Sequence, residues 1–558
     1  GGSVTPGHGR AKGRSSGVSS GARSRSPGVG DRWQRTLEIL GVRPYRRRVR
    51  RPPGELPGDL RYFESVAILD RRNLLRRAAA WTAAAALPSR AASSASEAGP
   101  LPVQVGDVDA GSAVVWAQGF VGAVGVRVVD GAATVFERPA RADRERADTV
   151  RVPVRGLRPG RRYRVELTGR GSDGARSTQA TFATAAVDGG RVRFAWSGDV
   201  AGQGFGIDPE RGGLFAFDAL GRETPDFFIF SGDTVYADGP LPPTRSLPDG
   251  TTWTNRVTTA KSRVAETLEE FRGQYRYNWL DPAYRRFFAQ VPVIAQWDDH
   301  ETRNNWFPGR RLDDDPRYTV TDCSVLARRA RRAFDEAFPR AAGADARIYR
   351  KVSRGPLLDV FVVDARSHRP SNCAVDPFAH AFWGAEQAEW LAGELVSSKA
   401  LWKVVACDMP LGLVVGDGPQ RYEAVADGYP GPPGFREIEV GRVLEALNAA
   451  GRRNVVFLTA DVHYAAAHRY ARPFPFWEFV AGPLHAGQFG PAELDPTFGP
   501  EVVFANRSPG DPQNVAPSRR SASYGVVEIA RGGELIVDLR DGGGRTLHRQ
   551  RVRPHRHG

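Results

Sequence analysis

The sequence predicts an α/β fold in which buried strands alternate with helices, preceded by a small β-sandwich. Two observations carry this prediction. The first is that six apolar runs, rich in Val, Ile or Phe, each stop at an aspartate: 192–199, 227–233, 291–299, 357–364, 404–408 and 455–461. Such runs are typical of strands that are covered on both faces. The second is that helical stretches separate the runs, which indicates a layered α/β domain.

The chain begins with a basic segment of low complexity. Residues 1–69 are rich in Gly, Ser, Pro and Arg, so we expect a disordered extension. Residues 70–98 contain Arg71-Arg72, then an Ala-rich stretch and small residues. This order is typical of a twin-arginine export signal, and the apolar part is too short for a membrane anchor. We therefore expect export by the twin-arginine machinery to an extracellular, periplasmic or cell-wall location. An Ala-rich helix with an arginine face is the alternative.

The positive charge is concentrated in the same segment. The net charge is +15, and residues 1–98 hold 19 Lys or Arg against 7 Asp or Glu. The rest of the chain is nearly neutral, so we do not expect nucleic acid as a binding partner. Binding of an anionic surface by the basic leader is the non-enzymatic alternative.

Residues 99–187 have the pattern of a small β-sandwich. Short alternating apolar runs at 113–116, 126–129 and 163–167 are separated by Gly and Asp turns. The stretch 157–163 resembles the strand-entry turn of fibronectin type III and immunoglobulin-like domains. It contains no chemical motif, and binding of carbohydrate or cell wall remains open.

Residues 188–555 form the larger predicted domain. Helices are expected at 262–274, 325–338, 385–395 and 441–450, and a closing hairpin at 525–530 and 535–539. The three cysteines permit at most one disulfide. A bridge between Cys323 and Cys373 and three unpaired thiols both remain open.

The acids at the run ends carry the functional prediction. Carboxyl ends of parallel strands meet at one edge, where converging carboxylates must be protonated, pair with arginine or hold cations. Three segments add further polar groups: Ser-Gly-Asp-Thr-Val-Tyr-Ala-Asp-Gly (231–239), Trp-Asp-Asp-His-Glu (297–301) and Ala-Asp-Val-His-Tyr (460–464).

These three segments resemble the motifs of PhoD-type alkaline phosphatases, which are metallophosphoesterases, and the resemblance extends from about residue 101 to the final hairpin. It implies a four-layer α/β/β/α metallophosphoesterase sandwich with two or more metal ions, Fe³⁺ and/or Ca²⁺. Asp199 stands where a cysteine would ligate ferric iron, so Mn²⁺, Mg²⁺ or Zn²⁺ also fit the oxygen and nitrogen donors. The implied metal ligands are Asp199, Asp233 (bridging), Tyr236, Asp299, Asp408, Asp461 and His463.

The expected activity is that of a secreted phosphoesterase that hydrolyses small-molecule or lipid phosphate esters through a metal-activated hydroxide. His300 is placed to hydrogen-bond the phosphate or protonate the leaving alkoxide, with Asp298 or Glu301 orienting its ring. Arg366 would clamp the phosphate, or else pair with Asp364. Phosphodiesterase or phospholipase D-type activity is the alternative, and the sequence leaves the oligomeric state open.

Overall fold

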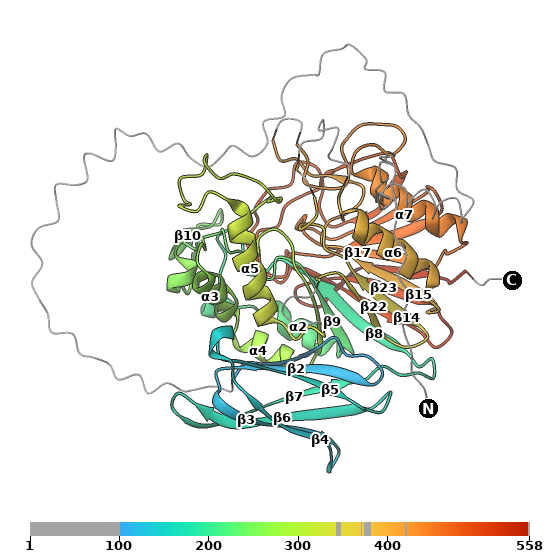
Figure 1. Cartoon of the computed structure of the whole chain (residues 1–558). Coiled ribbons are helices and arrows are strands. Elements are labelled where there is room, and N and C mark those ends of the chain that lie inside the picture. Colours follow the sequence, from blue (N-terminus) through green and yellow to red (C-terminus); the bar gives the residue numbers. More distant parts are fainter. Residues whose placement is uncertain (1–100, 342–346, 370, 373–380, 419–420, 556–558) are drawn as a thin grey trace, which may run out of the picture.

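The computed structural model describes residues 101–341, 347–369, 371–372, 381–418 and 421–555 (Figure 1). The predicted extension, the export signal and Cys373 lie outside these residues, and Cys323 and Cys407 are buried free thiols. None of the described helices has the length and apolar character needed to cross a membrane.

The N-terminal part consists of two small groups of strands that share a core. Its strands are β1 (Val103–Gly106), β2 (Ser112–Gln118), β3 (Val121–Asp130), β4 (Ala133–Arg141), β5 (Thr149–Arg155), β6 (Arg162–Gly171) and β7 (Gly174–Ala183). β4, β3, β6 and β7 form one sheet, whereas β2 pairs with β1 on one side and with β5 on the other. Val115, Val126 and Val165 lie in the common core. β1 also pairs with β12 of the larger domain, so the two parts are joined through one sheet (Figure 1).

Two large sheets form the centre of the molecule. The first has the order β24-β23-β22-β8-β9-β12-β1-β2-β5, and the second has the order β13-β14-β15-β17-β19-β18-β21. The further strands of the first sheet are β8 (Val192–Ser197), β9 (Phe227–Ser231), β12 (Val293–Gln296), β22 (Ser523–Ile529), β23 (Leu535–Asp541) and β24 (Thr546–Val552). Those of the second are β13 (Arg350–Ser353), β14 (Leu358–Val362), β15 (Trp402–Ala406), β17 (Val455–Thr459), β18 (Ala466–Tyr470), β19 (Phe476–Val480) and β21 (Pro500–Ala505). Two short pairs lie outside these sheets: β10 (Thr244–Ser246) with β11 (Thr252–Thr254), and β16 (Leu413–Val414) with β20 (Glu493–Leu494).

Each of the six predicted apolar runs contains a strand, namely β8, β9, β12, β14, β15 and β17. The predicted closing hairpin is β22 and β23, and β24 extends it by a third strand that the sequence analysis missed. β8, β9 and β12 run parallel to one another, as do β14, β15 and β17. The acids that follow these strands therefore leave each sheet at one edge.

Helices cover the outer faces of both sheets. The helices are α2 (Ala216–Arg222), α3 (Leu268–Asn278), α4 (Pro282–Phe288), α5 (Cys323–Ala337), α6 (Ala385–Ser397) and α7 (Glu437–Ala449). Along β9, Phe228 and Phe230 pack in the same core as α2 to α5, whereas Phe227 and Ile229 lie in the core between the two sheets. Side chains of α6 and α7 share a third core with Phe361 and Phe457 of the second sheet. The layer order is α/β/β/α, as expected.

The helices differ from the prediction in one boundary and in two short helices that were not expected. α3 begins six residues later than expected because Thr267 and Glu270 form a capping box at its start. α2 and α4 were not predicted, since seven residues give little helical periodicity.

Candidate metal centre

The loops that follow the strands hold four predicted ligands in an unusual backbone conformation. φ is 65° at Asp199, 46° at Asp233, 65° at Asp461 and 61° at His463. Residues with a side chain seldom adopt this region, although Asp, Asn and His tolerate it best. Gly232 also has a positive φ of 76°, and a side chain there would collide with Asp298. Strained positions of this kind cluster at functional sites because the surrounding structure holds them.

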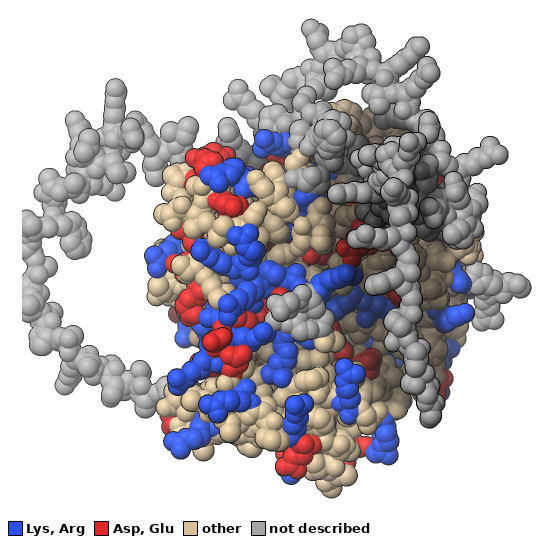
Figure 2. Space-filling view, in the orientation of Figure 1, with Lys and Arg blue, Asp and Glu red and all other residues tan. Residues whose placement is uncertain are grey.

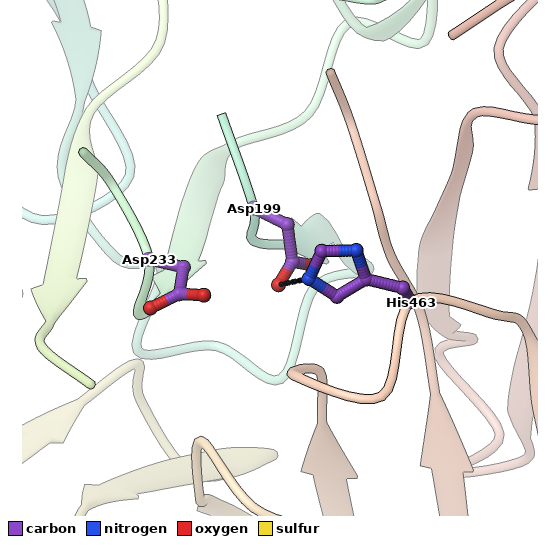
Figure 3. Close-up of side chains that lie close together, drawn as sticks. All are labelled: Asp199, Asp233 and His463. Carbon is purple, nitrogen blue, oxygen red and sulfur yellow. Dashed lines mark ion pairs between the residues drawn. The ribbon is translucent and has the colours of Figure 1, made fainter. Parts of the chain in front are cut away.

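Asp199, Asp233 and His463 form the first of three overlapping groups (Figure 3). One ligand atom from each lies within 4.8 Å of the others. Nε2 of His463 is 3.4 Å from Asp199 Oδ1 and 2.8 Å from the phenol oxygen of Tyr236. Nδ1 lies 2.5 Å from the carbonyl oxygen of Gly487, to which it donates, so Nε2 keeps its lone pair. Burial lowers the pKa of His463 to about 4, which keeps the ring in the neutral, metal-binding form.

The second and third groups are linked to the first because neighbouring groups share a residue. The second consists of Asp233, Asp299 and His300, and the third of Asp298, Asp299 and Asp461. Asp233 belongs to the first two groups, and Asp299 belongs to the last two. A carboxylate shared between neighbouring groups can bridge two cations, which is the role expected for Asp233.

Several of these oxygens have no hydrogen-bond partner within the described part of the chain. Both carboxylate oxygens of Asp199 are buried and unpartnered, as is Oδ1 of Asp299. Burial and neighbouring carboxylates raise the pKa values of Asp199 and Asp233 well above the usual range. Buried acids that are neither paired nor hydrogen-bonded are costly. The donor set of oxygens and one imidazole nitrogen fits the hard and borderline metals expected from the sequence.

Asp299 differs from its neighbours in its ionisation. Burial would raise its pKa, but Arg366 and His300 reverse this effect and hold the pKa below the usual range. The backbone N–H of Asn305 also donates to its Oδ2 over 2.5 Å. Asp299 is therefore an ionised carboxylate at the junction of two groups.

Arg366 lies at the opposite end of the acid cluster, fully buried. Its Nε is 2.5 Å from Asp298 Oδ1, and its guanidinium also pairs with Glu423 and lies 3.5 Å from Asp461. The alternative pairing with Asp364 is wrong, because that carboxylate accepts the backbone N–H of Arg366 instead.

Asp408 lies on the arginine side of the cluster and outside the three groups. Its Oδ1 is 3.2 Å from the side-chain nitrogen of Gln296, and its Oδ2 is 3.7 Å from Arg366 Nε. Burial and the nearby Asp298 raise its pKa well above the usual range. The structure thus places this predicted ligand beside the others but in contact with the arginine.

The ring of His300 is oriented by a residue that the sequence analysis did not single out. Nδ1 lies 2.6 Å from Asp238 Oδ1, and the ring centroid is 4.1 Å from that of Tyr236. The prediction that Asp298 or Glu301 orients the ring is wrong. Glu301 instead accepts from the backbone and hydroxyl of Thr234, both at 2.6 Å. Asp238 follows Asp233 by five positions in the same motif, and this second acid was the available signal.

Glu423 is a second residue that was missed. It is buried and pairs with Arg366, and burial together with Asp299 raises its pKa to about 8 against the opposing effect of Arg366. No apolar run precedes it, so its position in a loop gave no signal in the sequence.

Known phosphatases resemble this chain in sequence. The model of a family described as PhoD-like phosphatase matches residues 194–542, which is more than half of the chain. Alkaline phosphatase D of Bacillus subtilis (strain 168) is 26% identical over 348 residues, which cover 57% of this chain and 57% of that protein. The chain thus spans a little over half the length of this curated relative.

One solved structure shows the same fold, and a second aligns less well. The "Structure of PhoD" aligns with a TM-score of 0.62 at 20% identity, covering 80% of this chain and 91% of that one. A purple acid phosphatase from yellow lupin aligns with a TM-score of 0.49 at 12% identity, covering 81% of this chain and 73% of that one. The resemblance stated from the three sequence motifs is confirmed by the family match: the chain belongs to the PhoD-like phosphatase family.

Proposed function

We propose that this protein is a metal-dependent phosphoesterase that hydrolyses phosphate esters. The supporting observation is the row of three overlapping acid and histidine groups, which share Asp233 and Asp299 and contain unpartnered buried oxygens. Membership of the PhoD-like phosphatase family supports the same reaction class. Two or more cations fit the site, and its donors are compatible with Fe³⁺, Ca²⁺, Mn²⁺, Mg²⁺ or Zn²⁺.

Tyr236 and all members of the three groups except His300 and Asp298 would hold the cations. Asp199, His463 and Tyr236 would bind at one end, Asp233 would bridge, and Asp299 with Asp461 would bind at the other end. Bound cations would supply Lewis acidity, which acidifies water and neutralises charge on the phosphoryl oxygens. The hydrogen bond from His463 Nδ1 to Gly487 keeps the ring turned so that Nε2 faces Asp199.

His300 is the proposed proton donor to the leaving alkoxide. Asp238 accepts the Nδ1 proton, so the proton for transfer resides on Nε2. The ring of Tyr236 packs against the imidazole at an interplanar angle of 32° and limits its rotation. Asp238 is therefore a positioning residue for His300.

Arg366 has a different proposed role from the phosphate clamp expected from the sequence. Its guanidinium is enclosed by the carboxylates of Asp298, Glu423 and Asp461 and is fully buried. We propose that it balances their charge and fixes the third group, while Glu301 holds the turn that carries Asp233 through its bonds to Thr234. Asp408 contributes to the same arginine-centred network.

The proposed protein has two domains and an export signal. Residues 99–187 are an immunoglobulin- or fibronectin-like sandwich, and residues 188–555 are the catalytic domain. The proposed location is outside the cytoplasm, reached by twin-arginine export directed by residues 70–98.

On the face shown in Figure 2, basic side chains gather around α5, where Arg331 and Arg332 pair with Asp335 and Glu336. Such paired arginines do not favour nucleic acid as a partner.

The test is an activity assay on the purified full chain loaded with each candidate metal. Nitrophenyl phosphate reports monoesterase activity and bis(nitrophenyl) phosphate reports diesterase activity, which separates the main proposal from its phosphodiesterase alternative. Asp233→Asn should lower kcat/KM by a factor of about 10³ or more, since it removes a shared ligand. The matched control is Asp218→Asn, which changes an exposed aspartate on α2. Full activity and full metal content in Asp233→Asn would refute the proposal.

A further inference from the structure

A second cluster of acids lies away from the metal centre and shares no residue with it. Asp427, Glu437 and Asp495 each place a carboxylate oxygen within 4.8 Å of the other two. They come from three segments: the loop after β16, the first residue of α7, and the loop after β20. All three side chains are buried, with 5%, 1% and 2% exposure respectively. Buried acids gathered from distant segments require compensation for their charge.

One carboxylate oxygen in this cluster has no partner. Oε2 of Glu437 accepts the backbone N–H of Gly434 at 3.1 Å, whereas Oε1 is buried without a hydrogen bond from any described residue. The hydroxyl of Thr497 is also buried and, among the described residues, meets no group with full hydrogen-bond geometry, although it lies close enough to Glu437 to lower the pKa of that carboxyl. Burial, Asp427 and Asp495 nevertheless raise that pKa to about 9.

Two of the three acids have no basic partner within the part of the chain that the structure describes. Among the described residues, neither Glu437 nor Asp495 forms an ion pair with Lys or Arg. Arg436 adjoins Glu437 in sequence, but its guanidinium donates to the backbone carbonyls of Glu423 and Ala424. Asp495 is instead oriented by the backbone N–H groups of Gly428 at 2.9 Å and Thr497 at 2.8 Å.

We propose that Asp427, Glu437 and Asp495 bind a Ca²⁺ ion, with the Thr497 hydroxyl as a further oxygen donor. The ligands are all hard oxygens and come from three separate segments, which suits Ca²⁺ with its variable geometry better than the strictly octahedral Mg²⁺ or the nitrogen- and sulfur-seeking Zn²⁺. The ion would tie the loop after β16 to α7 and to the loop after β20. Because Glu423 lies on the first of these loops and pairs with Arg366, the site would also steady the edge of the metal centre.

The experiment counts bound Ca²⁺ and measures its effect on stability. The full chain is freed of metal with EDTA and dialysed against Ca²⁺, and bound calcium is determined by elemental analysis. Glu437→Gln should bind about one Ca²⁺ fewer per chain than the unmodified protein and lose part of its Ca²⁺-induced rise in Tm. Glu445→Gln, on the exposed face of the same helix, is the matched control and should retain both.

The outcomes distinguish this site from the catalytic one. Bound calcium and Tm are measured without substrate, so a failure of the proposed phosphoesterase activity would not alter the result. If Glu437→Gln does not fold, Asp427→Asn is expected to show the same loss. Unchanged calcium content and an unchanged Tm rise in Glu437→Gln would overturn the proposal. A glutamine can replace a protonated glutamic acid without loss only if that acid binds no cation. A larger Tm rise with Mg²⁺ than with Ca²⁺ would overturn the choice of ion.

Discussion

The phenol oxygen of Tyr236 lies 2.8 Å from Nε2 of His463, although 227 positions separate the two residues. Tyr236 follows a strand of the first sheet and His463 follows a strand of the second, so this contact joins the two halves of the sandwich. Both atoms carry lone pairs, and His463 Nδ1 already has a partner in Gly487. The pair is thus arranged either to share one proton or to bind one cation.

Removal of the phenol should therefore weaken metal binding. Tyr236→Phe keeps the ring contact with His300 but deletes one donor, and we expect metal affinity to fall by a factor of about 10 or more. Elemental analysis after dialysis against graded chelator measures this loss. Tyr464→Phe, which changes another buried tyrosine whose oxygen accepts the backbone N–H of Ala492, is the control. Equal metal retention in the two variants would exclude Tyr236 as a ligand.

The Asp238 carboxylate should affect turnover more than substrate binding. Asp238→Asn removes the negative charge that faces His300 Nδ1, so the ring loses its fixed orientation. We expect kcat to fall by a factor of about 10 to 100 with little change in KM. Steady-state kinetics with a nitrophenyl ester measures both constants. The exposed Asp249, changed to Asn, provides the comparison. A rise in KM at constant kcat would contradict the positioning role.

Arg366 should be important for stability even without substrate. Arg366→Met leaves Asp298 and Glu423 buried without their cation, which typically costs about 3–5 kcal/mol. Urea unfolding in EDTA measures the loss, because no bound metal then offsets the repulsion. Arg311→Met breaks an exposed pair with Asp313 and an exposed hydrogen bond to the Thr321 hydroxyl, and it should leave the free energy of unfolding nearly unchanged. A residue that served only to clamp phosphate would show no such difference.

Lys403 on β15 should make stability depend on pH. Burial, together with repulsion from Arg452, lowers its pKa from 10.5 to about 8 in the folded chain, against the attraction of Asp359. Between pH 8 and 10.5 the unfolded chain binds the proton that the folded chain has lost, so stability rises with pH over this range. The free energy of unfolding should rise by about 1 kcal/mol more in the unmodified protein than in Lys403→Met, a value reduced for partial solvation. Urea titrations at pH 8 and 10 measure this difference, and parallel curves would disprove it.

The predictable part of the fold was the part with strong local patterns. The buried strands β8, β9, β12, β14, β15 and β17 consist mostly of apolar residues, a local pattern that can be recognised without knowing which strands lie beside them. Ligands such as Asp233 and Asp461 were found because each directly follows such a run. Short helices such as α2 and α4 gave too few turns for a periodic signal.

Other features depend on contacts between segments that are distant in the chain. Asp238 beside His300, Glu423 beside Arg366, and the position of Asp408 against Arg366 rather than within a metal group could not be read from local sequence. The sequence by itself determined the strands and the acids at their ends, because burial and side-chain chemistry act within a few residues. Only the tertiary structure decided which acids share a cation site and which face an arginine, because Coulomb interactions depend on distances in space.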